Sequence, residues 1–223
     1  MPEWSTYNLS DLILFTERTY YRQFELYNQD IWPLQIPALA TGIAILMFIC
    51  LRPLWHGRAI AILMTLAWVW VAWAYHHERF ATINWIANWY AIAFAVEASL
   101  LCWFGVIRKQ LVFTETRPVL KIAGLGVFVV ALVILPFTTT LIRDWQQIEL
   151  FAMAPDPTVL ATLGLLLLAA NKSWILFIIP ISWCLISGAT LWVLKSPTAL
   201  TLPLIAIASL LLTLTTKRNI PGR

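Results

Sequence analysis

Seven long apolar runs, separated by short polar turns, restrict this chain of 223 residues to one class of fold. A helix of about 20 apolar residues crosses the roughly 30 Å of hydrocarbon in a bilayer. Because 61% of the residues are hydrophobic and only 12% are charged, a soluble core could not bury all the runs. We therefore predict an all-α integral membrane protein with about seven transmembrane helices. The expected spans are approximately 32–51, 59–75, 84–107, 119–142, 158–170, 174–194 and 198–216.

The segment 1–31 precedes the first run and is amphipathic rather than membrane-spanning. Aromatic side chains recur at helical spacing between Tyr20 and Tyr27, and charged side chains take the opposite face. Ser10 and Thr16 are the candidate N-caps. We expect an amphipathic interfacial helix that lies on the membrane or plugs its own bundle; an arm that docks a partner is the alternative.

The rest of the chain forms one transmembrane helical bundle, 32–216, and a basic cytoplasmic tail, 217–223. Lysine and arginine mark the cytoplasmic side of membrane proteins. With seven spans and the N-terminus outside, ten of the fifteen basic residues lie inside, whereas a re-entrant fifth run would put the basic tail outside. The expected location is a bacterial inner membrane with a cytoplasmic C-terminus. The ten residues are Arg52, Arg58, Arg108, Lys109, Arg117, Lys121, Lys172, Lys217, Arg218 and Arg223.

Glu97 is a carboxylate in the middle of an apolar run. Such a group costs at least about 2.5 kcal/mol near the bilayer centre, so it should face the bundle interior. Tyr90 lies seven residues earlier, on the same helical face. One interpretation is a carboxylate that handles a proton or cation; the other is a structural glutamate bonded to a hydroxyl such as Ser187 or Thr190. Both remain open at this stage.

Four further polar residues are candidates for an outer polar entrance: His76, His77, Asn84 and Asp156. Adjacent histidines point to different sides, so His76 and His77 cannot form the i, i+4 pair that binds zinc on a helix. Asn84 opens the third span, where capping is the alternative role. Asp156 is expected to cap the fifth run, with Pro157 at the first helical position. We predict no metal site from these residues.

Other function classes find no support in the sequence. The basic residues gather at span ends and form no aromatic-interleaved stripe, so no nucleic-acid partner is expected. No enzyme or cofactor motif is present, and the three cysteines are scattered within apolar runs. The expected partner is the lipid bilayer, with other membrane subunits or a second copy of the chain as further candidates.

Two hypotheses for the function follow from these features. The first is a small permease or channel-like transporter of a small solute or ion, in which Glu97 handles a proton or cation. The alternative is a non-catalytic integral-membrane subunit that anchors or stabilises partner chains. A membrane metalloenzyme built on His76, His77 and loop acids is a third and weaker alternative.

Several short stretches resemble those of a known family, and the likeness extends over nearly the whole chain. They include the residues 18–28 (RTYYRQFELYN), 81–85 (ATINW), 154–158 (APDPT) and 183–192 (WCLISGATLW). The chain is similar to an uncharacterised family of small bacterial polytopic inner-membrane proteins, a domain of unknown function loosely labelled permease. The resemblance implies a polytopic bacterial protein and brings no established catalytic or binding residues.

Overall fold

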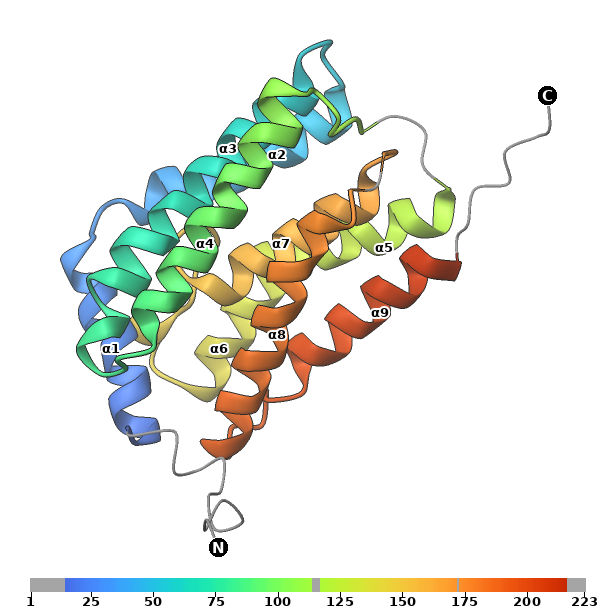
Figure 1. The fold of residues 1–223 in the computed structure, drawn as a ribbon. Helices are drawn as coiled ribbons and strands as arrows, with labels where there is room; N and C mark the ends of the chain where they lie inside the picture. Colours follow the sequence, from blue (N-terminus) through green and yellow to red (C-terminus); the bar gives the residue numbers. More distant parts are fainter. Residues whose placement is uncertain (1–14, 114–116, 172, 216–223) are drawn as a thin grey trace, which may run out of the picture.

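The structure, a computed structural model, describes residues 15–113, 117–171 and 173–215, which are mostly helical (Figure 1). No β-strand occurs within those ranges, so the predicted all-α fold class is confirmed. The α-helices are α1 (Glu17–Asp30), α2 (Gln35–Leu51), α3 (His56–Trp70), α4 (Ala87–Leu101), α5 (Pro118–Val129), α6 (Leu135–Ile142), α7 (Pro155–Leu168), α8 (Ile175–Val193) and α9 (Thr201–Thr215). The π-helical segments η3 (Val71–His77), η5 (Cys102–Ile107) and η6 (Val130–Ile134) extend α3, α4 and α5, and η4 (Phe80–Thr82) and η7 (Trp145–Gln147) are 3₁₀ turns.

Within the described ranges, four continuous helices are long and apolar enough to cross a membrane. They run over His56–Thr82, Ala87–Ile107, Pro118–Ile142 and Ile175–Val193. α1 and α2 meet this criterion only as a pair, and they are bent by 94° at the break between them. α7 and α9 are shorter apolar helices. Every predicted run therefore has a helix, while the number that crosses a bilayer stays a prediction.

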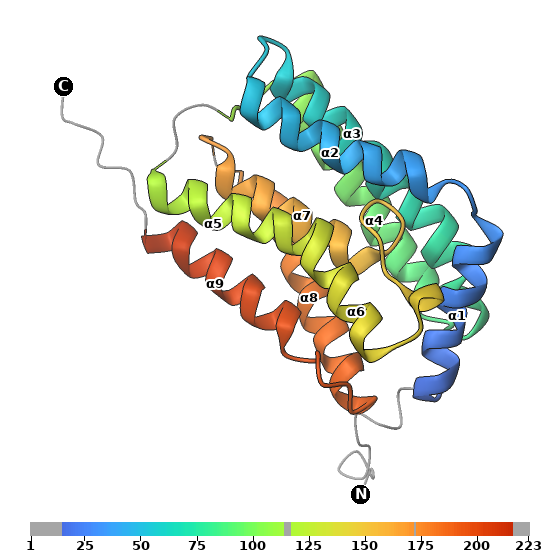
Figure 2. The same cartoon turned by 180° about the vertical axis from the view of Figure 1, so that it is seen from behind.

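Successive helices run back and forth between two ends of the molecule (Figures 1 and 2). At the end where α1 lies, which we call the α1 end, Asn28 donates hydrogen bonds to the carbonyl oxygens of Gln146 and Ile148, at 2.8 and 2.9 Å. At the opposite end, the Arg58 side chain donates to the Val106 carbonyl oxygen at 3.2 Å. We call this the basic end, because the loops there and the first turn of α3 carry Arg52, Arg58, Arg108 and Lys109.

α1 is an amphipathic helix that packs against its own bundle. Thr16 is its N-cap, as predicted, and its side chain accepts a hydrogen bond from the Thr19 amide at 3.3 Å. The buried face carries aromatic side chains: the Phe24 and Tyr75 rings stack with centroids 5.3 Å apart, and the Tyr27 hydroxyl donates to the Met153 carbonyl oxygen at 3.0 Å. The sequence left open whether this helix lies on the membrane, packs on its own bundle or docks a partner. In the structure its aromatic face packs on one end of the bundle. Ser10, the other candidate cap, lies outside the described residues.

α7 is the central helix, and all fourteen of its residues are buried. It lies between the group α2, α3 and α4 and the group α5, α6, α8 and α9 (Figures 1 and 2). Its closest neighbour is α5, where a Cβ added at Gly164 would come within 2.7 Å of the Gly124 carbonyl oxygen. Gly124 thus permits the close approach of the two helices. Gly126 takes no part in it, because a Cβ added there would meet nothing within 4 Å.

Candidate functional site

The segment between α6 and α7 turns back into the bundle and buries two opposite charges. It carries Arg143, directly after α6, and Glu149, whose side chains are only 11% and 8% exposed. Their nearest charged atoms are 3.6 Å apart. The guanidinium carbon of Arg143 also lies 3.7 Å from the centre of the Tyr21 ring, so α1 covers this pair through a cation–π contact.

Asp156 adds a second buried carboxylate, in the first turn of α7. One oxygen accepts a hydrogen bond from the Trp183 indole nitrogen and the other from the Ser187 hydroxyl, both at 2.8 Å. The predicted capping role is wrong: Ala154 is the N-cap, Pro155 is the first helical residue, and the Asp156 side chain bonds to α8 instead. The positive end of the α7 dipole still favours this carboxylate.

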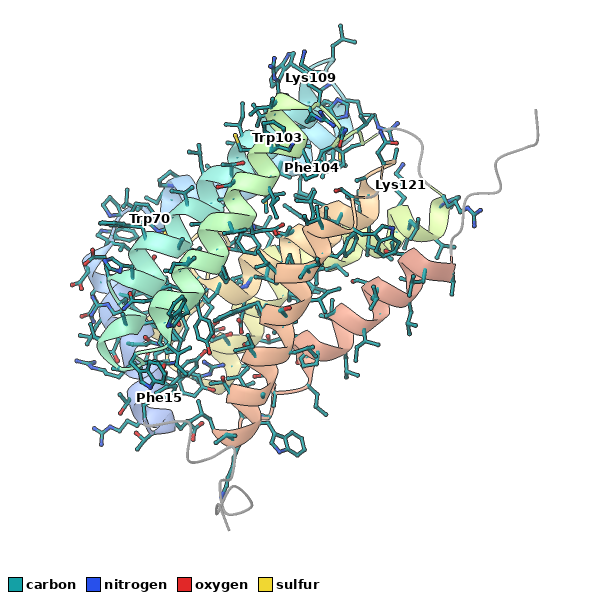
Figure 3. The ribbon with its side chains drawn as sticks, in the orientation of Figure 1. Phe15, Trp70, Trp103, Phe104, Lys109 and Lys121 are labelled. Carbon is teal, nitrogen blue, oxygen red and sulfur yellow. The ribbon has the colours of Figure 1, made fainter. Side chains whose placement is uncertain are left out.

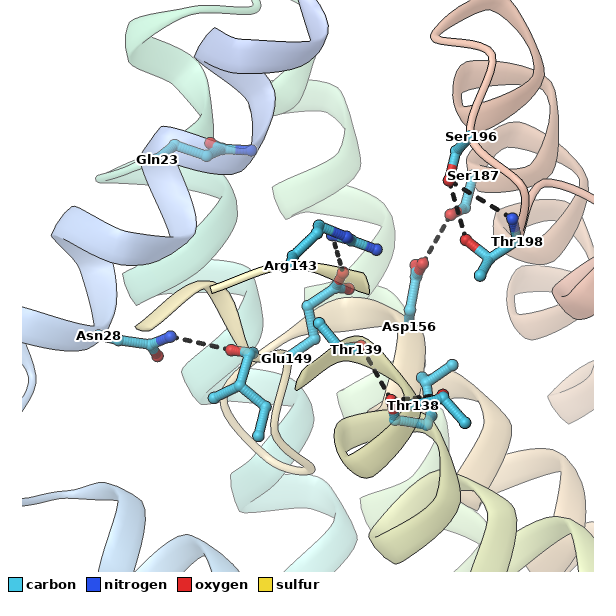
Figure 4. A network of polar contacts seen from close by, with 12 residues as sticks. Gln23, Asn28, Thr138, Thr139, Arg143, Glu149, Asp156, Ser187, Ser196 and Thr198 are labelled. Carbon is cyan, nitrogen blue, oxygen red and sulfur yellow. Dashed lines mark hydrogen bonds and ion pairs between the residues drawn. The ribbon is translucent and has the colours of Figure 1, made fainter. Parts of the chain in front are cut away.

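Arg143, Glu149 and Asp156 form what we call the charged cluster, and Figure 4 shows their side chains facing one interior region. Burial raises the pKa of Glu149 above its ordinary value, and the Asp156 carboxylate raises it further, against the opposing effect of Arg143. The two groups do not satisfy each other fully. Arg143 Nη1, the nitrogen of the 3.6 Å ion pair, and Glu149 Oε2 have no hydrogen-bond partner among the described residues. The cluster holds two carboxylates against one fixed cation, so it favours a further positive charge or a proton.

His76 is fully buried beside this cluster. Its ring centre lies 4.4 Å from that of Phe94 and 4.9 Å from that of Trp183, and both contacts are edge-to-face. Neither imidazole nitrogen has a hydrogen-bond partner in the part of the chain that the structure describes. His77 points the other way, is exposed, and has its Nδ1 2.9 Å from the Asn88 side-chain oxygen. The two histidines therefore take opposite sides, as the sequence indicated.

Glu97 lies deeper in the bundle and is fully buried, in agreement with its predicted inward orientation. Neither of its carboxylate oxygens has a hydrogen-bond partner within the described ranges. Phe94 precedes it by one turn on the same buried face of α4 and connects it to His76 and Trp183. Tyr90 lies one turn further out, with its ring 5.2 Å from Trp183. Glu97 and Tyr90 thus share one face, with aromatic rings between them.

The other candidate residues lie elsewhere. Ser187 and Thr190 were the candidate partners of Glu97 in the interpretation of that residue as a structural glutamate. Ser187 donates to Asp156 instead, and Thr190 donates to the Ile186 carbonyl oxygen of its own helix at 2.9 Å. Asn84 accepts a hydrogen bond from the Ile86 amide at 3.1 Å, which is a local turn contact rather than a pore lining.

A metal centre has no support within the described ranges, since no group of three or more His, Cys, Asp or Glu side chains is arranged to hold an ion. The four residues predicted to form an outer polar entrance do not lie together. His76 and Asp156 are buried in the bundle, whereas His77 and Asn84 lie near the surface.

Two members of the charged cluster, Arg143 and Glu149, were not among the candidate residues predicted from the sequence. A signal was present in the run Ile148–Ala154, in which Glu149 is the single charge among apolar residues. An apolar stretch of that composition in a loop indicates burial.

The fold and the site define a polytopic helical protein of membrane type whose interior encloses ionisable side chains. The chain belongs to a family of unknown function, DUF6064, which it matches over residues 17–221. This confirms the resemblance to an uncharacterised family. No curated protein and no solved structure matches the chain significantly.

Proposed function

We propose that the protein is a small permease of the bacterial inner membrane that moves a proton or a small cation. The observation that carries the proposal is the set of ionisable side chains enclosed in the bundle. Three carboxylates, Glu97, Glu149 and Asp156, and one imidazole, His76, are buried with a single guanidinium, Arg143. Ionisable residues inside a membrane are costly and mark ion pathways and proton relays.

These groups follow one another from the α1 end toward the middle of the bundle. Arg143 and Glu149 lie below α1, and Asp156 faces them from α7 (Figure 4). Trp183 bonds to Asp156 and touches Phe94, and Glu97 lies one turn beyond Phe94. A positive species that enters from the α1 end would meet carboxylates at each of these levels.

The orientation of the permease is part of the proposal. The α1 end would face outward and the basic end the cytoplasm, because lysine and arginine mark the cytoplasmic side. The C-terminal end of α9 lies at the basic end in Figure 1, which supports a cytoplasmic C-terminus.

The test is flux in proteoliposomes that contain the purified protein and a pH-sensitive dye. A proton gradient with a potassium diffusion potential supplies the driving force. We expect Glu97→Gln and Asp156→Asn each to abolish flux, because both remove a buried group that can take up and release a proton. Glu78→Gln and Asp144→Asn are the matched controls, since both of these acids are exposed, and should keep wild-type flux.

A wild-type rate equal to that of protein-free liposomes, for protons and for sodium and potassium ions, would overturn the proposal. Native mass spectrometry of the gently extracted protein then examines the alternative. Other polypeptides at a fixed ratio would favour a non-catalytic subunit of a larger membrane complex.

A further inference from the structure

The basic end contains a pocket that the charged cluster does not use. Its volume is about 250 Å³, and it lies between the start of α3 and the segment that follows η5. His56, Gly57 and Arg58 line one side, and Gly105 and Lys109 line the other. The two sides approach closely, because a Cβ added at Gly57 would lie 2.4 Å from the Leu111 carbonyl oxygen.

Among the described residues that line it, the pocket has positive charge and no acidic side chain. Arg58 and Lys109 are exposed at its wall, and no Asp or Glu occurs in the two lining stretches, 51–58 and 103–113. Arg58 is held in place by the bond from its Nε to the Val106 carbonyl oxygen, which leaves its terminal nitrogens for another acceptor. A fixed guanidinium beside an ammonium is suited to phosphate oxygens.

The start of α3 adds one feature that suits an anion, and the His56 ring adds a hydrogen-bond acceptor that has no partner among the described residues. Its N-cap, Trp55, makes no side-chain capping bond, so the first amides of this helix lack the usual side-chain acceptor. His56 Nδ1 lies 2.6 Å from the Pro53 carbonyl oxygen, and because a carbonyl only accepts, Nδ1 carries a proton. The other ring nitrogen, Nε2, is buried and has no partner among the residues described, so the pocket wall holds an unused polar atom.

Large apolar side chains surround the pocket mouth. Leu54 and Trp55 line it and are 106% and 57% exposed, and Trp103 and Ile107 on η5 are about half exposed. Figure 3 shows Trp103 and Lys109 at this same end of the bundle. Exposed tryptophans at the ends of apolar helices are typical of the level where acyl chains meet headgroups. The pocket therefore places positive charge next to hydrocarbon.

We propose that this pocket binds the phosphate group of an anionic phospholipid from the adjacent leaflet. The Arg58 guanidinium, the Lys109 ammonium and the backbone amides of Gly57 and Arg58 hold the phosphate, since the His56 amide already donates to the Pro53 carbonyl oxygen. Leu54 and Trp55 contact the glycerol and acyl region. A basic pocket between helices on the cytoplasmic side is suited to such headgroups.

The experiment is native mass spectrometry of the detergent-purified protein, titrated with phosphatidylglycerol and, separately, with phosphatidylcholine. We expect wild-type protein to retain phosphatidylglycerol in preference to phosphatidylcholine. The double variant Arg58→Gln/Lys109→Gln should bind phosphatidylglycerol about tenfold or more weakly. The double variant Arg52→Gln/Lys121→Gln loses the same charge from the same end outside the pocket and should bind like wild type. Gel filtration and thermal unfolding confirm that both variants are folded.

Two results would overturn the assignment. Equal loss of phosphatidylglycerol in both double variants would mean that general attraction to the basic end, rather than the pocket, holds the lipid. Binding of inorganic phosphate to lipid-free wild-type protein, together with its displacement of phosphatidylglycerol, would assign the pocket to a soluble phosphate compound instead.

Discussion

The crossing of α5 and α7 predicts a large loss of stability from one added methyl group. In Gly164→Ala the new Cβ would lie 2.7 Å from the Gly124 carbonyl oxygen and 2.9 Å from the Phe128 nitrogen, whereas ordinary contact begins at 3.4 Å. The two helices must therefore separate by about 0.7 Å at this point, and a gap of that size forfeits a quarter to a half of the dispersion energy of the contacts it opens. Both obstructing atoms belong to the backbone, so no side chain can rotate away. We expect a cost of about 3 kcal/mol, the upper end of the range for overpacked cores.

Gly126→Ala, on the partner helix α5, is the matched control, because a Cβ at that position would meet nothing within 4 Å. Removing a glycine from an exposed helical position changes stability by no more than about 1 kcal/mol, in the stabilising direction. The assay is equilibrium unfolding in mixed micelles, followed by tryptophan fluorescence, for wild type and both variants. The reasoning is refuted if the free energy of unfolding of Gly164→Ala is within about 0.5 kcal/mol of the wild-type value. It is also refuted if Gly126→Ala is destabilised as much as Gly164→Ala.

Three further predictions concern the buried polar groups. Asp156→Ala leaves the Trp183 indole N–H without its acceptor and should lower the free energy of unfolding by about 3 kcal/mol in the same assay. The control Asp144→Ala removes an exposed carboxylate and should stay within about 0.5 kcal/mol of wild type. Equal effects of the two variants would contradict a stabilising role for the hydrogen bonds of Asp156. His76→Phe removes two unpartnered nitrogens from an aromatic surround and should change stability by less than about 1.5 kcal/mol while abolishing proteoliposome flux; normal flux would show that the imidazole takes no part in transport. Because Glu149 has a raised pKa in the folded chain, about 8 against an ordinary 4.5, the folded state holds this proton more tightly than the unfolded state. Stability should therefore be greatest below pH 4.5 and fall as the pH rises toward 8, and Glu149→Gln should flatten that part of the pH profile of unfolding; an unchanged profile would refute the assignment.

The sequence was sufficient to predict the helices, because each apolar run ends at a charged, proline or polar turn. It did not show that the fifth run is the centre of the bundle. In a soluble protein, a helix that is apolar on every side is recognised as buried. In a membrane protein every spanning helix is apolar on every side, so the same pattern does not separate α7, with all residues buried, from a lipid-facing helix such as α4.

The candidate site was only partly predictable for a related reason. Glu97 stood out because a lone charge within a long apolar run has one physical explanation, an inward orientation. Arg143 and Glu149 lie in a connecting segment, where charges are ordinarily solvated, and their burial depends on α1 folding back over them through Tyr21. That contact joins parts of the chain more than a hundred residues apart, and no local pattern encodes it.

Because α7 is completely enclosed by other helices, its length does not have to match the thickness of the membrane. A helix of fourteen residues is about 21 Å long, well short of the hydrocarbon layer, and a lipid-exposed helix of that length would force the bilayer to thin around it. In a bilayer the surrounding helices would take up that mismatch instead, because they cover α7 on every side. The depth of Asp156 is then fixed by protein contacts, to Trp183 and Ser187, and not by lipid. Bilayers of different thickness would tilt the outer helices and leave the central carboxylate at the same place relative to its partners.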